Sequence, residues 1–201
     1  MLRALPIRTR RRTVVLAAAV LAAVLVVVLV TAWPGGGGDS DATTVDGNAG
    51  AVLYPAGHRP VAPGFTGTTL TGSMLSSSSY RGQVVVLNFW GSWCVPCREE
   101  ASTLAAVAAK YRPSGVSFLG VDVRDTTASA QAFVNQFHVG YPSVGDPGSV
   151  ITADFSDVVP IAATPTTLVI DRTGHIAGAV FGTVTYSDLT AILAKVTAKG
   201  G

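Results

Sequence analysis

The chain carries the sequence VVVLNFWGSWCVPC at residues 84–97. Its first part, Val84 to Phe89, is a short apolar run rich in β-branched residues, which predicts a strand that is covered on both faces. Both cysteines of the chain, Cys94 and Cys97, follow this strand directly. A helix is predicted after them, because apolar residues recur at i, i+3, i+4 and i+7. These residues are Leu104, Val107, Ala108 and Tyr111.

This placement predicts a redox-active dithiol. At the N-terminus of a helix, unsatisfied N–H groups and the helix dipole stabilise an anion and thereby lower the pKa of a thiol. We therefore predict that Cys94 is the nucleophile and that Cys97, three residues later on the same helical face, resolves the mixed disulfide. Pro96 falls in the first turn, where a missing N–H costs little.

Two structural interpretations of the cysteine pair remain as alternatives. A stabilising disulfide that closes a four-residue loop removes only about 2 kcal/mol of chain entropy, less than a long loop would remove. A zinc site needs four ligands, whereas the chain has no further cysteine and its histidines, His58, His138 and His175, are widely separated. We therefore predict neither a metal nor a cofactor.

From about Val61 onward the chain alternates between strands and amphipathic helices. The further predicted strands are 116–123, 166–170 and 176–181, the last two joined by a turn at 171–174. Asp125 and Ser187 are plausible N-caps of two more helices. Their apolar stripes are Ala130, Phe133, Val134 and Phe137, and Leu189, Ile192, Leu193 and Val196. This order predicts a single α/β domain over residues 61–201.

A membrane anchor is predicted from Val14 to Trp33. Seventeen consecutive apolar residues run from Val14 to Val30, and about 20 helical residues cross the roughly 30 Å hydrocarbon core of a bilayer. Residues 1–13 hold five arginines and no acidic residue, so this basic tail is expected in the cytoplasm and the rest of the chain outside it. The alternative is a cleaved signal, with Val30 and Ala32 before the cut, and a secreted protein.

A flexible, glycine-rich linker is predicted at residues 34–60, because Gly35 to Gly38 lie near its start and no helical or strand periodicity follows. Without the five N-terminal arginines, the chain has nine Lys and Arg against twelve Asp and Glu, a net charge of −3. This balance gives no support for a nucleic-acid partner.

Several motifs resemble the TlpA-like branch of extracytoplasmic thioredoxins, over about Val61 to Leu193. They are Ala62-Pro63-Gly64-Phe65, Tyr80-Arg81-Gly82-Gln83, Asn88 to Glu100, and TPTTLVIDRTG at 164–174. The resemblance implies a thioredoxin fold, in which helices flank a central mixed β-sheet. It also implies an N-terminal extension and an insertion at about residues 141–160, before a cis-proline.

The same resemblance implies where a client protein binds. Pro165 is expected to be that cis-proline, packed beside the cysteines, with Thr164 presenting its backbone to a bound client strand. Trp93, because it is next to Cys94, is expected in an apolar collar around the sulfurs, and the alternative is an ordinary core aromatic. Val95 and Pro96, between the two cysteines, are expected on the same client-binding surface.

A proton acceptor is expected at Glu100. Asn88 stands where cytoplasmic thioredoxins have a buried aspartate that helps proton transfer, and an amide cannot titrate. The resemblance passes this role to Glu100, which comes three residues after Cys97 and is therefore near it on the helix. The alternative is a first-turn glutamate that only interacts favourably with the helix dipole.

By this resemblance the chain is expected to be a membrane-anchored, extracytoplasmic thiol-disulfide oxidoreductase. Reduced Cys94 would attack a disulfide of an exported client such as oxidised apocytochrome c, Cys97 would resolve the adduct, and a membrane electron donor would restore the dithiol. An oxidising, disulfide-forming enzyme is one alternative. A copper metallochaperone is another, although its cysteines are typically separated by three residues and here by two. A peroxiredoxin would need a Thr-x-x-Cys motif, which is absent.

Overall fold

The computed structural model describes residues 43–45 and 48–198. Within this part of the chain, one sheet has the strand order β1-β2-β9-β8-β5-β6-β7. Its strands are β1 (Thr43–Val45), β2 (Asn48–Leu53), β5 (Val84–Trp90), β6 (Val116–Val123), β7 (Ser143–Asp146), β8 (Thr166–Ile170) and β9 (Ile176–Phe181). Strands β5, β6 and β7 are parallel, and the other neighbours are antiparallel. This mixed sheet confirms the predicted thioredoxin-like α/β fold.

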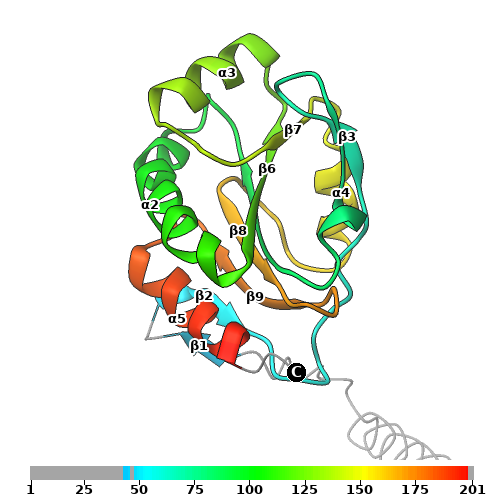
Figure 1. Cartoon of the computed structure of the whole chain (residues 1–201), viewed down its shortest axis with the longest axis vertical. Helices are drawn as coiled ribbons and strands as arrows, with labels where there is room; N and C mark the ends of the chain where they lie inside the picture. Colours follow the sequence, from blue (N-terminus) through cyan, green and yellow to red (C-terminus); the bar gives the residue numbers. More distant parts are fainter. Residues whose placement is uncertain (1–42, 46–47, 199–201) are drawn as a thin grey trace, which may run out of the picture. The chain divides into compact units, whose positions relative to one another are not determined.

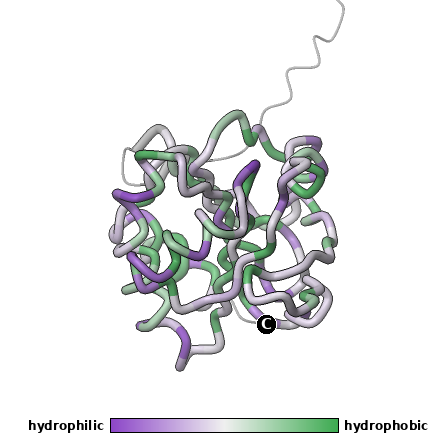
Figure 2. The backbone as a smooth tube through the Cα atoms, turned by 90° about the horizontal axis from the view of Figure 1, so that it is seen from above, coloured by the Kyte–Doolittle hydropathy of each residue, from purple (hydrophilic) through white to green (hydrophobic). Residues whose placement is uncertain are grey.

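Helices pack on both faces of the sheet. They are α2 (Val95–Tyr111), α3 (Thr127–Gln136), α4 (Val150–Ser156) and α5 (Tyr186–Ala198), with 3-10 turns η1 (Ser77–Tyr80) and η2 (Arg112–Ser114). Strands β3 (Thr66–Thr68) and β4 (Met74–Ser76) form a small separate sheet. Helices α2 and α5 lie on one side of the main sheet and α4 lies on the other (Figure 1). Figure 2 shows hydrophobic and hydrophilic residues interspersed along the backbone, seen from above.

Strand β5 is the centre of the fold, because all of its residues are buried. Its side chains alternate between the two faces, as in any strand. Val84 and Val86 belong to the core formed with α2 and α5. Leu87 and Phe89 belong to the core formed with α4, where the Phe89 ring lies 5.3 Å from that of Phe155. The predicted central strand is confirmed, and it carries Asn88 and Trp90 on the α2 side.

The residues before β5 contain strands that the sequence did not reveal. Strand β2 pairs antiparallel with β9, so that Val52 lies opposite Ala179. Ala51 is fully buried, and the Tyr54 N–H donates to the Ala177 carbonyl at 2.9 Å. The prediction of a flexible linker is therefore wrong for 43–45 and 48–60, and the domain begins before residue 61. These strands are short, and their pairing depends on a partner strand that is remote in sequence.

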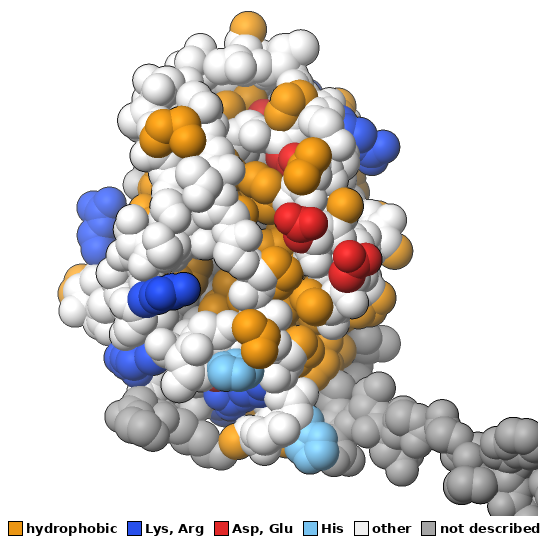
Figure 3. Space-filling model, turned by 90° about the vertical axis from the view of Figure 1, so that its right-hand side faces the viewer, with side chains coloured by type: hydrophobic (Ala, Val, Ile, Leu, Met, Phe, Trp, Pro, Cys, Tyr) orange, Lys and Arg blue, Asp and Glu red, His pale blue; other side chains and the backbone are white. Residues whose placement is uncertain are grey.

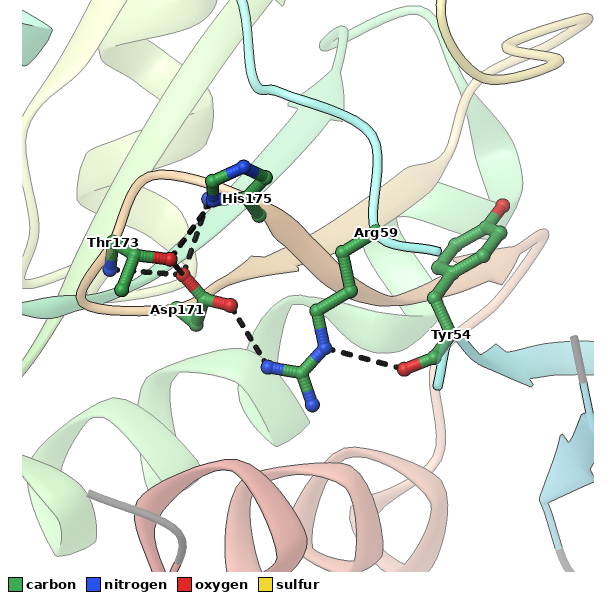
Figure 4. A network of polar contacts seen from close by, with 5 residues as sticks. All are labelled: Tyr54, Arg59, Asp171, Thr173 and His175. Atoms are coloured by element: carbon green, nitrogen blue, oxygen red, sulfur yellow. Dashed lines mark hydrogen bonds and ion pairs between the residues drawn. The ribbon is translucent and has the colours of Figure 1, made fainter. Parts of the chain in front are cut away.

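A polar network attaches residues 54–59 to the turn between β8 and β9 (Figure 4). Arg59 forms an ion pair with Asp171 at 2.8 Å and donates to the Tyr54 carbonyl at 3.2 Å. Asp171 also accepts from the backbone N–H groups of Thr173 at 2.9 Å and His175 at 3.1 Å. Burial acts to raise the pKa of Asp171, but the hydrogen bonds that it accepts, foremost the one from the Thr173 hydroxyl at 2.6 Å, outweigh burial and lower the pKa.

Both predicted helix N-caps are wrong by one or two residues. Helix α3 is capped by Thr126, whose Oγ1 accepts from the backbone N–H three residues later at 3.2 Å. Asp125, the predicted cap, instead accepts from the loop that precedes the cysteines. At α5, the Oγ1 of Thr185, not Ser187, accepts from the Asp188 N–H at 3.1 Å. In each case a neighbouring hydroxyl competes for the cap position, and the sequence does not show which one wins.

The segment predicted as an insertion, about 141–160, folds as part of the domain. It contains β7 and α4. Strand β7 extends the sheet beyond β6 in parallel register, with Gly120 opposite Ser143.

No helix in the described part of the chain is both long and apolar enough to cross a bilayer. The predicted basic tail at 1–13 and the predicted anchor from Val14 to Trp33 lie outside the described residues.

A groove of about 430 Å³ opens between the segment before β5 and the turn after β8. Its lining includes Phe65, Tyr80, Val85, Leu119 and Ile170. Figure 3 views the molecule from the side on which Figure 1 shows β3 and α4, and hydrophobic side chains gather down the middle of that face. Neither cysteine lines this groove.

Candidate active site

The two cysteines lie where β5 passes into α2. They form a disulfide with a Cα–Cα distance of 5.3 Å. Cys94 is the N-cap residue of α2, and its sulfur accepts a hydrogen bond from the Cys97 N–H at 3.2 Å. Pro96 lies in the first turn, as predicted. Because the free N–H groups and positive dipole end of α2 surround Cys94, the position stabilises a thiolate when the pair is reduced.

The loop between β5 and Cys94 is fixed by contacts to its backbone and indole. The Ser92 N–H donates to Asp125 Oδ2 at 2.6 Å, and Arg98 donates twice to the Ser92 carbonyl at 2.8 and 3.1 Å. The Trp93 indole N–H donates to the Val123 carbonyl at 3.0 Å. A Cβ atom at Gly91 would lie 2.5 Å from the Trp93 indole nitrogen, so this close approach requires glycine.

The aromatic residues around the cysteines divide into exposed and buried ones. Trp93 is 48% exposed beside Cys94, which agrees with a place on the client-binding surface. Val95 is 65% exposed, and Pro96 is exposed as well. Trp90, in contrast, is buried and stacks on Phe133 with ring centroids 4.5 Å apart. The exposed apolar surface therefore comes from the cysteine loop itself.

Glu100 is buried in the domain, with 1% of the residue exposed. Its carboxylate accepts from the Asn88 side-chain amide at 2.9 Å and from the Val184 N–H at 2.7 Å. Burial raises the pKa of Glu100 to about 7, although these two hydrogen bonds act to lower it. A glutamate that served only the helix dipole would not need to be buried, so the interpretation as a mere first-turn residue explains this geometry poorly.

A small cavity lies beside Cys97. Its volume is about 10 Å³, and Cys97, Asn88, Trp90 and Tyr141 are among the residues that line it. Burial and the charge of Glu100 both raise the pKa of Tyr141. Cys97 thus lines the same cavity as Asn88, whose side-chain amide donates to Glu100.

The Thr164–Pro165 peptide bond is cis, as the resemblance implied. Pro165 is buried and Thr164 is partly exposed. In the β5–β8 pair, Thr166 lies opposite Phe89. The cis-proline therefore precedes β8 at the same edge of the sheet at which β5 leads into the cysteine loop.

Two acidic residues lie at the end of β6, Asp122 within the strand and Asp125 just after it, and sequence reasoning missed their role. Asp122 lies opposite Trp90 and is buried. The pKa of Asp122 is raised to about 7, first by burial and then by the charge of Asp125 and a hydrogen bond with it. Burial acts against ionisation of Asp125, but its hydrogen bonds, those from Ser92 foremost, lower its pKa. The available signal was the position of these carboxylates at the end of a strand parallel to β5.

This arrangement can be compared with known proteins. The AhpC/TSA family model matches residues 59–179. The chain belongs to the AhpC/TSA family. It is 32% identical over 136 residues to thiol-disulfide oxidoreductase ResA of Bacillus thuringiensis (strain Al Hakam), a match that covers 68% of this chain and 76% of that protein. ResA of Bacillus subtilis (strain 168) is 32% identical over 126 residues, 63% of this chain and 68% of that protein.

Solved structures of similar fold are also thiol-disulfide proteins. A secreted thiol-disulfide isomerase from Corynebacterium glutamicum superposes with a TM-score of 0.69 and 30% identity, over 78% of this chain and 97% of that one. A DsbF homologue from Corynebacterium diphtheriae gives a TM-score of 0.67 and 34% identity, over 76% and 97%. The resemblance to TlpA-like thioredoxins is confirmed, and the protein is a thiol-disulfide oxidoreductase with a Cys94–Cys97 pair.

Proposed function

We propose that this thiol-disulfide oxidoreductase works outside the cytoplasm, anchored by Val14 to Trp33, and reduces disulfides of exported proteins. The observation that carries the proposal is Cys94 at the N-cap of α2, with the Cys97 N–H 3.2 Å from its sulfur. The basic residues before the apolar run support the orientation, and one structural neighbour is described as secreted. The resemblance to TlpA-like thioredoxins supplies the client, oxidised apocytochrome c.

In the first step, the Cys94 thiolate attacks one sulfur of the client disulfide. A bond forms between Cys94 Sγ and that sulfur, the client S–S bond breaks, and the second client sulfur leaves as a thiolate that takes up a proton. The helix end stabilises the attacking anion before the reaction. Exposed Trp93, Val95 and Pro96 offer apolar surface to the client chain, and the Thr164 backbone pairs with it.

In the second step, Cys97 releases the client. Its thiol gives a proton to the Glu100 carboxylate and its sulfur attacks Cys94 Sγ, so that the mixed disulfide breaks and the client leaves as a dithiol. The pKa of Glu100, about 7, suits a proton acceptor near neutral pH. The enzyme is then in the disulfide form seen in the structure, and a membrane electron donor returns two electrons and two protons to it.

The proposal is tested by trapping clients in membranes of cells that express Cys97→Ala. This variant retains the attacking thiol and lacks the resolving one, so exported clients should remain attached to Cys94 and be identifiable by mass spectrometry. Cys94→Ala is the matched control and should trap nothing. An absence of mixed disulfides with Cys97→Ala would contradict the proposal, and adducts formed with cytoplasmic proteins would contradict its location.

A further inference from the structure

Two arginine side chains flank the loop that leads to the nucleophile. Arg98 lies in the first turns of α2 and donates through Nε and Nη2 to the Ser92 carbonyl at 3.1 and 2.8 Å. Arg124 follows β6, and its guanidinium carbon lies 5.8 Å from the centre of the Trp93 ring. Both arginines are exposed, and Trp93, the residue directly before Cys94, is 48% exposed. Two cationic groups and an aromatic ring thus border the cysteine at which a client must arrive.

The backbone of Arg124 is held in an unusual conformation. Its φ angle is 50°, in the left-handed region that long side chains seldom adopt. Such a conformation is unfavourable and persists only where the surroundings impose it. Here the Arg124 N–H donates to the Asp146 carbonyl at 3.1 Å, and the preceding Val123 carbonyl accepts from the Trp93 indole at 3.0 Å. The fold therefore holds the guanidinium beside the cysteine loop.

Within the part of the chain that the structure describes, neither Arg98 nor Arg124 forms an ion pair with a carboxylate. The oxygens of Asp125 accept from the backbone N–H groups of Ser92 at 2.6 Å and Thr126 at 2.7 Å. Asp122 is buried. Glu99 is exposed and lies about 100° further round α2 than Arg98.

We infer that Trp93, Arg98 and Arg124 select client segments that carry acidic side chains next to the target disulfide. This inference rests on the proposed function and names the chemistry of its clients. A guanidinium has five N–H donors in a planar fork that matches a carboxylate, and Arg98 uses only those on Nε and Nη2 for Ser92. Complementary charge also raises the rate of encounter between partners.

The experiment measures kcat/KM for reduction of two synthetic peptides by the full-length protein in detergent, with dithiothreitol as the source of electrons and its uncatalysed rate subtracted. The peptides contain the same internal disulfide, flanked by glutamates in one and by lysines in the other. We expect the acidic peptide to be favoured about tenfold at low ionic strength, with the preference shrinking in about 0.5 M salt because salt screens exposed charges. Arg124→Glu should reverse the preference toward the lysine peptide, a result that misfolding cannot produce.

Arg112→Gln is the matched control for a changed surface charge, because Arg112 is exposed at the far end of α2. It should preserve the preference of the unmodified protein. Equal kcat/KM for both peptides, or an acidic preference that survives Arg124→Glu, would overturn the charge selection while leaving the proposed function intact. If neither peptide is reduced, the proposed function itself fails.

Discussion

Two carboxyl groups of the domain, one buried and one half-buried, have pKa values that are shifted in opposite directions. Asp171, at the turn between β8 and β9, meets the Arg59 guanidinium at 2.8 Å and several backbone and hydroxyl donors, and its pKa is lowered. Glu100, under the cysteine helix, accepts from one amide side chain and one backbone N–H and has no cation among these partners. Its pKa is raised to about 7. The structure thus keeps one carboxylate charged and leaves the other able to exchange a proton near neutral pH.

The difference shows how the surroundings of a carboxyl group decide whether it stays charged or exchanges a proton. A carboxylate paired with a cation stabilises the folded chain as long as it is ionised. A carboxylate buried with neutral donors costs stability when it ionises, but its proton can leave and return at working pH. We therefore expect changes at Glu100 to affect the reaction and changes at Asp171 to affect only the stability of the domain.

The largest expected effect is that of Glu100→Gln on client release. Loss of a general base typically costs about 10²–10⁴-fold in rate, and we expect a loss of about 10²-fold in resolution of the mixed disulfide by Cys97. In the unmodified protein, the alkylation rate of Cys97 should also rise with pH through about 7 as Glu100 ionises. Stopped-flow kinetics and alkylation followed by mass spectrometry measure both effects.

Glu99→Gln is the matched control, because it makes the same change at an exposed position one residue earlier. It should leave both the release rate and the pH profile unaltered. An unchanged pH dependence of Cys97 alkylation in Glu100→Gln would reject Glu100 as the proton acceptor.

The next effect concerns stability against pH. Glutamate ionises near pH 4.3 in an unfolded chain, whereas folded Glu100 ionises at about 7. Its contribution is therefore most favourable below about pH 4 and is lost as pH rises to about 7, on the order of 3 kcal/mol. Asp122 acts in the same direction, because its pKa is also raised to about 7. Urea unfolding of the oxidised protein at pH 5 and pH 8 measures this loss.

In Glu100→Gln the decline between pH 5 and pH 8 should be smaller, and in the double variant with Asp122→Asn it should be smaller still. A decline of equal size in all three proteins would show that neither carboxyl group holds its proton in the folded state.

A smaller effect is expected for Asp171→Asn at the other end of the sheet. The change removes the partner of Arg59 and should lower the free energy of unfolding at pH 7 by about 1–2 kcal/mol. Because the pKa of Asp171 is lowered by its partners, this contribution exists above about pH 4 and is lost as pH falls below it. Urea unfolding at pH 7 and pH 3 checks the sign, and client reduction should not change.

Asp154→Asn, at an exposed position of α4, is the control. It should leave the free energy of unfolding unchanged at both pH values. If Asp171→Asn slowed client reduction tenfold at full stability, the division between attachment and catalysis would be wrong.

The smallest effect is expected for Asp125→Ala in the loop after β6. It removes the acceptor of the Ser92 N–H, and one such hydrogen bond contributes about 1 kcal/mol. We expect a loss of this size in unfolding free energy together with a few-fold lower rate of client reduction, measured by urea unfolding and steady-state kinetics. A stability loss without any loss of rate would show that Asp125 does not position the cysteine loop.

Local patterns predicted the elements that build the centre of the fold. The apolar run from Val84, the stripe of α2 and the strands 116–123, 166–170 and 176–181 were found where the structure has them. These elements are long and regular enough for the periodicity of their apolar residues to be visible in the sequence. Strands β1 and β2 were missed, because they are short and become strands only by pairing at the edge of β9.

The part of the site that is contiguous in sequence was predictable, and the part contributed by a remote strand was not. Cys94, Cys97 and Pro96 follow from spacing and from their place between a strand and a helix. The roles of Asp122 and Asp125 did not follow, because β6 brings them to the cysteine loop from about 30 residues away. Arg124 was missed for the same reason, since its side chain matters only where it lies over Trp93.

The amino-acid sequence by itself determined the dithiol, its place at a helix N-terminus and the α/β order of the domain, because these depend on neighbours along the chain. Only the tertiary structure decided which carboxylate is charged and which holds a proton. That outcome depends on burial and on donors from remote strands and loops, such as Asn88, Val184 and Arg59, which no local pattern can report.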